Sequence, residues 1–106
     1  MTGLTGLLKG ALSGIVLQHL ASGETYGYEI TEYLKNLGFS EIAEGTVYTV
    51  LVRLEKLNLV EVQRRHSLVG PPRKFYRLND AGRAYLADFW TKWDFLADKM
   101  AQIKEG

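Results

Sequence analysis

The hydrophobic pattern of this chain changes its period at Leu59, and that change restricts the fold more than any other sequence feature. Before Leu59, apolar residues recur every three or four positions, which is the spacing of one face of an α-helix. After it, segments 59–65 and 73–78 alternate between apolar and polar residues, as strands do. The Gly-Pro-Pro run at residues 70–72 separates the two segments and marks a loop. The pattern therefore predicts helices followed by a β-hairpin.

Two helices are expected in the first forty residues. Apolar residues at helical spacing predict a first helix over residues 4–20, ended by Gly23, and they cover more than one of its faces. Such a helix has to be covered from two sides. Thr25 is placed to cap a second helix, which Gly38 would stop.

A third helix is expected over residues 44–57, and Asn58 lies where a left-handed residue would end it. Asn79 or Asp80 can cap a final helix that begins near Ala81 and runs almost to the end. The fold class is thus mainly α with a small β-hairpin (α+β). This order predicts a winged helix-turn-helix over residues 1–78 and a helix over 79–106 that packs with the first helix. The core face of the third helix is expected to hold Val47, Val50, Leu51, Leu54 and Leu57.

Length and composition restrict the function. The 106 residues suit one domain, and 46% hydrophobic residues with two prolines are typical of a globular chain. The absence of cysteine excludes disulfides and thiolate chemistry and agrees with a reducing cytoplasm. The first apolar stretch is interrupted by Gln18 and His19 and is too short to span a bilayer, so no membrane partner is expected. No catalytic or metal-binding spacing surrounds His19 or His66, so neither an enzyme nor a cofactor is expected.

The polar side of the third helix is unusual, because it carries hydroxyls, methyl groups and cations in place of the usual Glu, Gln and Ala. These groups are the ones that contact base edges and phosphates. The alternative is that Tyr48 and Val52 pack against a neighbouring segment. The candidate DNA contacts on this helix are Thr46, Tyr48, Thr49, Arg53 and Lys56.

Charge is distributed unevenly, although the net charge is only +1. Residues 53–77 contain seven Lys or Arg against Glu55 and Glu61, whereas residues 1–45 contain two Lys against five Glu. A local basic segment is typical of nucleic-acid binding, although an ordinary solvated hairpin would also carry charge. The hairpin residues expected to neutralise phosphate are Arg64, Arg65, Arg73 and Lys74.

The final helix carries apolar residues spaced three, four, three, four and three apart, which is the seam of a coiled coil. Its partner is either a second copy of the chain or the first helix. Trp90 lies at the flank of the seam, where paired indoles of a dimer would line a slot for a flat aromatic or cationic effector; otherwise Trp90 is packing alone. The expected dimer interface consists of Leu86, Phe89, Trp93, Leu96, Met100 and Ile103.

Three motifs, "TYGYEI", "EGTVYTVLVRLEKLNLV" and "GPPRKFYRLNDAGR", together resemble the PadR family of transcriptional regulators, in its compact subfamily with one C-terminal helix. The resemblance implies a cytoplasmic homodimer that represses a promoter at a palindromic operator and often releases it on binding a small molecule. It places the third helix in the major groove and the hairpin beside it. The residues that it puts at the DNA are Thr46, Tyr48, Thr49 and Arg53, with Arg73 and Lys74 on the wing.

Two positions depart from the family pattern. Ala43 stands where a capping Ser or Asn is expected, and Asn58 stands where Gly is usual. A missing cap weakens a helix start by about 1 kcal/mol. The alternative function is a winged-helix module that binds a protein and no DNA, which the basic hairpin disfavours.

Overall fold

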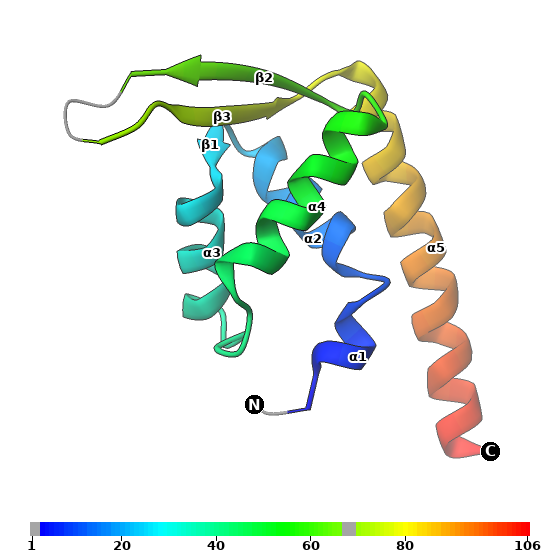
Figure 1. The fold of residues 1–106 in the computed structure, drawn as a ribbon. Coiled ribbons are helices and arrows are strands. Elements are labelled where there is room, and N and C mark those ends of the chain that lie inside the picture. Colours follow the sequence, from blue (N-terminus) through cyan, green and yellow to red (C-terminus); the bar gives the residue numbers. More distant parts are fainter. Residues whose placement is uncertain (1–2, 67–69) are drawn as a thin grey trace.

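The computed structural model describes residues 3–66 and 70–106. Within them the chain forms five helices and a three-stranded antiparallel sheet in the order β1-β3-β2, which confirms the α+β class (Figure 1). The hairpin of β2 and β3 projects at one end, and α5 runs down the side of the molecule. The elements are α1 (Thr5–Leu8), α2 (Leu12–Ala21), β1 (Thr25–Tyr26), α3 (Gly27–Asn36), α4 (Glu44–Lys56), β2 (Val60–Arg65), β3 (Arg73–Leu78) and α5 (Asp80–Glu105).

The prediction of one continuous first helix was wrong. The chain breaks between α1 and α2, and the Ala11 amide donates to the Leu8 carbonyl in a tighter turn than that of an α-helix. Gly10 lies inside this turn, and a glycine costs a helix about 1 kcal/mol relative to alanine. Neither helix has a side-chain cap at its start. Four-residue α1 is therefore held by its surroundings and not by its own propensity.

The expected capping role of Thr25 was also wrong. Thr25 and Tyr26 form β1, in which Thr25 pairs with Tyr76 of β3. The N-cap of α3 is Tyr26, in extended conformation and without a side-chain hydrogen bond. The buried Thr25 hydroxyl has no hydrogen-bond partner among the described residues. A two-residue strand is too short to show an alternating pattern, so periodicity did not predict it.

The core lies between α2, α3, α4 and the sheet. On α4, Val47, Leu51 and Leu54 are buried as expected, but Leu57 is 49% exposed, which corrects its core assignment. Leu57 is the C-cap, where the helix ends and its face no longer points inward. The core consists mainly of Leu12, Val16, Leu17, Leu20, Ile30, Leu34, Val47, Leu51, Leu54, Leu59, Val60, Tyr76, Leu78 and Leu86.

Two asparagines connect the hairpin to the helices on either side. Asn58 adopts φ 57°, the left-handed conformation expected of it, and the Leu59 amide donates to the Leu54 carbonyl in a Schellman-type ending. Asn79 caps α5 by accepting a 2.8 Å hydrogen bond from the Gly82 amide, as predicted for this residue. Its side-chain amide also donates to the Asn58 carbonyl at 2.8 Å. The end of α4 and the start of α5 are thereby tied together at the base of the hairpin.

Candidate nucleic-acid interface

The five candidate residues of α4 are all exposed. Helical geometry places Thr49 and Lys56 opposite the buried face. Thr46 and Arg53 lie toward α1, where they line a cavity of about 420 Å³ together with Lys9. The Thr49 hydroxyl donates to the Gly45 carbonyl at 3.0 Å, so its oxygen is still able to accept a hydrogen bond. This surface offers hydroxyls and two cations without a carboxylate at its centre.

Tyr48 lies on the other flank of α4, beside the sheet. Its ring covers Gly27 so closely that a Cβ on that glycine would meet ring atoms at 2.8 Å. Burial, together with the nearby Glu44 carboxylate, raises the pKa of the Tyr48 phenol above its ordinary value. The packing alternative for Tyr48 is therefore correct, although 42% of the residue remains exposed. The Tyr48 ring thus packs against α3 and still has an exposed part that another molecule could contact.

A groove of about 550 Å³ separates α4 from the hairpin, which we call the wing (residues 60–78). Tyr26 and Tyr28, which the sequence reasoning missed as site residues, form the wall nearest α3. Both belong to the "TYGYEI" motif, so the signal was present but was assigned to fold and not to the site. The groove is lined by Tyr26, Tyr28, Glu44, Tyr48, Val52, Pro71, Pro72, Arg73, Lys74 and Tyr76.

Strand alternation divides the wing cations between two faces of the sheet. Arg64 pairs with Lys74 across the strands, on the same face as the buried Tyr76. We call this the inner face, since the Lys74 ammonium reaches Glu55 of α4 at 3.6 Å. The next pair, Arg65 with Arg73, lies on the outer face, although Arg73, near the tip of the wing, also lines the groove beside Lys74. The four predicted phosphate contacts are therefore not one cluster.

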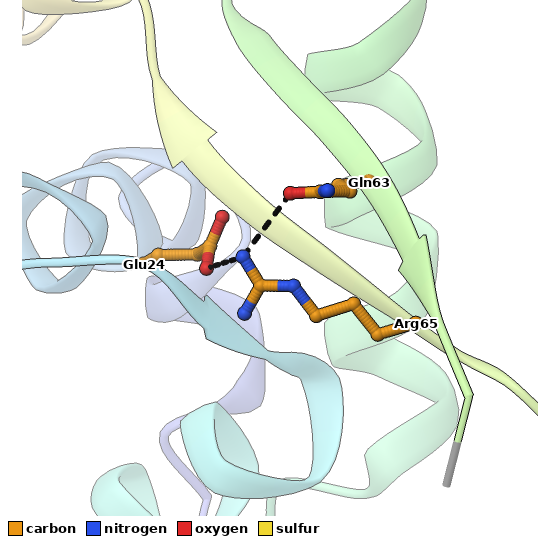
Figure 2. Close-up of polar contacts among 3 residues, drawn as sticks. All are labelled: Glu24, Gln63 and Arg65. Atoms are coloured by element: carbon orange, nitrogen blue, oxygen red, sulfur yellow. Dashed lines mark hydrogen bonds and ion pairs between the residues drawn. The ribbon is translucent and has the colours of Figure 1, made fainter.

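The arginines of the outer face are engaged within the chain. Arg65 forms an ion pair with Glu24 and donates to the Gln63 side chain at 3.1 Å (Figure 2). Its guanidinium also lies over the Phe75 ring, 4.7 Å from the ring centre. Arg73 lies over the Tyr26 ring at 4.8 Å. The sequence reasoning did not identify Glu24 as the partner of Arg65, because the two are far apart along the chain.

The six seam residues of α5 divide into two groups. Leu86 is buried in the core, and Phe89 packs against Gly14 of α2. The other four are exposed, and Trp93 and Leu96 line a cavity of about 350 Å³ beside Leu7. The first two seam positions thus serve the fold of the chain itself. The four exposed positions are Trp93, Leu96, Met100 and Ile103.

Trp90 is tied to α2 in the structure. Its indole N–H donates a 2.8 Å hydrogen bond to the Gln18 side chain, and its ring meets Phe89 edge-on at 5.1 Å. Trp90 is not among the residues that line the cavity beside Trp93. These contacts support the packing role of Trp90. Within a single chain, a ligand bound in the cavity beside Trp93 would not be lined by Trp90.

The described part of the chain contains no group of three or more His, Cys, Asp or Glu side chains placed to hold a metal ion. Nor does any helix within residues 3–66 and 70–106 have the length and apolarity needed to cross a membrane.

The fold and the polar face of α4 define a winged-helix protein of the class that regulates transcription. Comparison with known proteins agrees with this class. The profile of the transcriptional regulator PadR-like family matches residues 16–88. The chain therefore belongs to the PadR-like family of transcriptional regulators, as its motifs predicted, and members of this family are regulators and not enzymes.

Solved structures show the same fold over nearly the whole chain. A Streptococcus transcriptional regulator is 41% identical, with 94% of this chain and 98% of that chain covered and a TM-score of 0.82. A PadR-like transcriptional regulator from Bacillus cereus is 33% identical, with 96% and 99% covered and a TM-score of 0.82. Bacillus subtilis PadR in complex with operator DNA is 30% identical, with 74% of this chain and 46% of that chain covered and a TM-score of 0.68.

Proposed function

We propose that this regulator binds double-stranded DNA sequence-specifically, with α4 in the major groove and the wing beside it. The observation that carries the proposal is the exposed face of α4, which presents Thr49, Arg53 and Lys56 to solvent. On one flank of this face, Tyr48 borders the groove that Arg73 and Lys74 of the wing also line. Bacillus subtilis PadR, which is similar to this chain in fold, was solved in complex with operator DNA, and this supports DNA as the partner. The protein–DNA contacts are proposed to come from Thr46, Tyr48, Thr49, Arg53, Lys56, Arg64, Arg65, Arg73 and Lys74.

These residues have two kinds of role. Arg53 and Thr49 suit base edges, because Arg binds guanine bidentately and a Thr methyl fits the thymine methyl group. Lys56, Arg64 and Lys74 suit phosphates, which position the protein but carry no sequence information. Tyr48 and Thr46 lie at the two flanks of α4 and would contact the DNA backbone at the two sides of the major groove.

We further propose that two copies associate through α5. The exposed apolar side of this helix would be covered by its counterpart, and the cavity between Leu7 and Trp93 would close in the same interface. A two-fold dimer presents two α4 helices to two half-sites about one DNA turn apart, which requires a palindromic operator. The subfamily with one C-terminal helix matches this arrangement, because α5 follows the wing directly.

Repression released by an effector is part of the proposal, and so is a cytoplasmic location. Trp90 does not line the cavity beside Trp93, but its ring contacts Phe89, which does. In the dimer, the apolar walls of this cavity suit a flat aromatic or cationic compound, with Trp90 at its edge. An effector bound there would alter the contact between the two copies and hence the distance between their α4 helices. DNA binding would then depend on the effector without direct competition.

Substitution of Arg53 tests the proposed function. An operator is first selected from a random DNA pool, and the affinity of wild type is compared with that of Arg53→Ala. Loss of a bidentate base contact should cost about 1–3 kcal/mol and relax the preference at one position in each half-site. Arg83→Ala is the control, because Arg83 is exposed at the start of α5, outside the proposed contact surface. Equal operator affinities for wild type and folded Arg53→Ala would remove Arg53 from the interface.

A winged-helix module that binds only proteins is the alternative, and ionic strength discriminates the two. DNA binding releases counterions, so its affinity falls steeply with salt. Selection of no DNA sequence, together with salt-independent binding of a protein, would favour the alternative.

A further inference from the structure

Two wing cations are paired with carboxylates of the same chain. Arg65 of the outer face is paired with Glu24, the residue just before β1, and Lys74 of the inner face is paired with Glu55 of α4. Figure 2 shows the Arg65 side chain extended from β2 across β3 toward Glu24. The two carboxylates thus occupy the guanidinium and the ammonium, the groups that a phosphate would otherwise contact.

Neither pair is held firmly. The side chains of Arg65 and Glu24 are 44% and 26% exposed, and those of Lys74 and Glu55 are 35% and 42% exposed. Ion pairs of this exposure contribute little to stability, since water screens them. An Arg–phosphate contact is bidentate and also releases counterions from DNA. A phosphate held close to the cation can therefore displace the carboxylate.

The Arg65 side chain is also placed for such an exchange. Its guanidinium lies over the Phe75 ring, 4.7 Å from the ring centre, and this contact does not depend on Glu24. Arg65 is the last residue of β2, so its flexible stem begins where the strand ends and the connection to β3 starts. Release from Glu24 would let the guanidinium swing along the ring toward that connection.

We infer that Glu24 is a specificity-determining residue, which holds Arg65 in the free protein and yields it only to closely placed phosphate. Non-specific affinity for DNA is almost entirely electrostatic, whereas operator affinity also includes base contacts. In the operator complex, base contacts hold the phosphates close enough to displace the carboxylate, whereas random DNA lacks these contacts. The ion pair therefore lowers the affinity for random DNA more than the affinity for the operator. Glu55 acts in the same way on Lys74. This inference rests on the proposed DNA-binding function.

The test compares Glu24→Gln with wild type on a short random-sequence duplex, by fluorescence anisotropy over a range of salt concentrations. Freeing one cation should steepen the slope of log affinity against log salt by about 0.9. At about 0.1 M salt this corresponds to a roughly five- to ten-fold gain in affinity for random DNA. The gain on the selected operator should be smaller. Glu55→Gln should act in the same direction through Lys74.

Glu61→Gln is the matched control. Glu61 is exposed on the outer face of the wing, opposite Arg77, and no ion pair joins it to another residue in the described ranges. This substitution also removes one negative charge, here from the wing itself, but it breaks no ion pair, so the salt slope should not change.

A double substitution shows whether Glu24 acts through Arg65. Glu24→Gln should give no gain in an Arg65→Gln background, because there is no cation to release. A gain that persists there, or a slope equal to that of wild type in Glu24→Gln, would overturn the inference while leaving operator binding intact. If wild type bound neither operator nor random DNA, the proposed function itself would fail.

Discussion

At the scale of single residues, Tyr48 connects the architecture to the proposed interface. Its ring lies on Gly27, the first residue of α3, and is held there because that position has no side chain. The orientation of one proposed DNA contact thus depends on a glycine in a different helix. The periodicity of a single helix cannot predict this, because Gly27 and Tyr48 belong to different helices.

Gly27→Ala should therefore weaken both stability and operator binding. Alanine normally stabilises a helix by about 1 kcal/mol relative to glycine, but here its Cβ would meet the Tyr48 ring and displace it. We expect a net loss of roughly 1–3 kcal/mol, the usual range for overpacking, measured by chemical denaturation. The comparison is Gly45→Ala in α4, where a Cβ meets no atom within 4 Å and stability should rise. A Gly27→Ala protein as stable as wild type would mean that the ring moves freely.

At the scale of elements, the junction between α4, the wing and α5 depends on Asn79. Its side chain forms two hydrogen bonds of 2.8 Å, one that caps α5 and one that reaches the carbonyl of Asn58. Gly82 belongs to the same junction, because a Cβ there would lie 2.1 Å from the Leu59 carbonyl oxygen. The junction fixes the base of the wing relative to both helices.

Asn79→Ala should lower the free energy of unfolding by about 2 kcal/mol, since a lost cap costs up to that amount and a second bond is lost with it. Asn79→Asp separates the two bonds. It keeps the oxygen that accepts from Gly82, but it cannot donate to the Asn58 carbonyl. Denaturant titration should place this variant between wild type and Asn79→Ala. Equal stabilities for the two variants would assign the whole effect to the Asn58 contact.

Much of the element order was predictable because it depends on local chemistry. The alternation of β2 and β3, the left-handed Asn58 and the Asn79 cap are all determined within a few residues. The break before α2 was missed because apolar spacing continues through Gly10 although the helix does not. β1 was missed because it exists only through its pairing with β3.

The candidate site was predictable in composition but not in arrangement. The exposed face of α4 carries the hydroxyls and cations that its sequence suggested. The engagement of Arg65 by Glu24 and of Lys74 by Glu55 could not be inferred, because each pair joins distant parts of the chain. Leu86 was assigned to a dimer seam, yet it is buried within one chain, because the start of α5 packs on the core. Periodicity identifies an apolar face but not what covers it.

At the scale of the whole molecule, the exposed half of α5 leads to a prediction about assembly. Wild type should sediment as a dimer at micromolar concentration, and Met100→Glu should sediment as a monomer, because an unpaired charge would be buried in the seam. Gln102→Glu is the control, since Gln102 lies on the opposite side of α5 and receives the same charge. Operator affinity should fall only in Met100→Glu. A wild-type protein that sediments as a monomer would contradict the dimer.

The length of α5 also has a mechanical consequence. Its 26 residues correspond to about 39 Å at 1.5 Å per residue. A rod of that length, tilted by about 5° at one end, moves the other end by roughly 3 Å, which is close to the rise of one base pair. If two copies cross along α5, a change of a few degrees in the crossing angle would shift the two α4 helices relative to each other by about one base pair. Helix α5 then acts as a lever. A ligand bound between the two copies, without touching the DNA, would change the separation of the α4 helices so that it no longer matches the spacing of the operator half-sites.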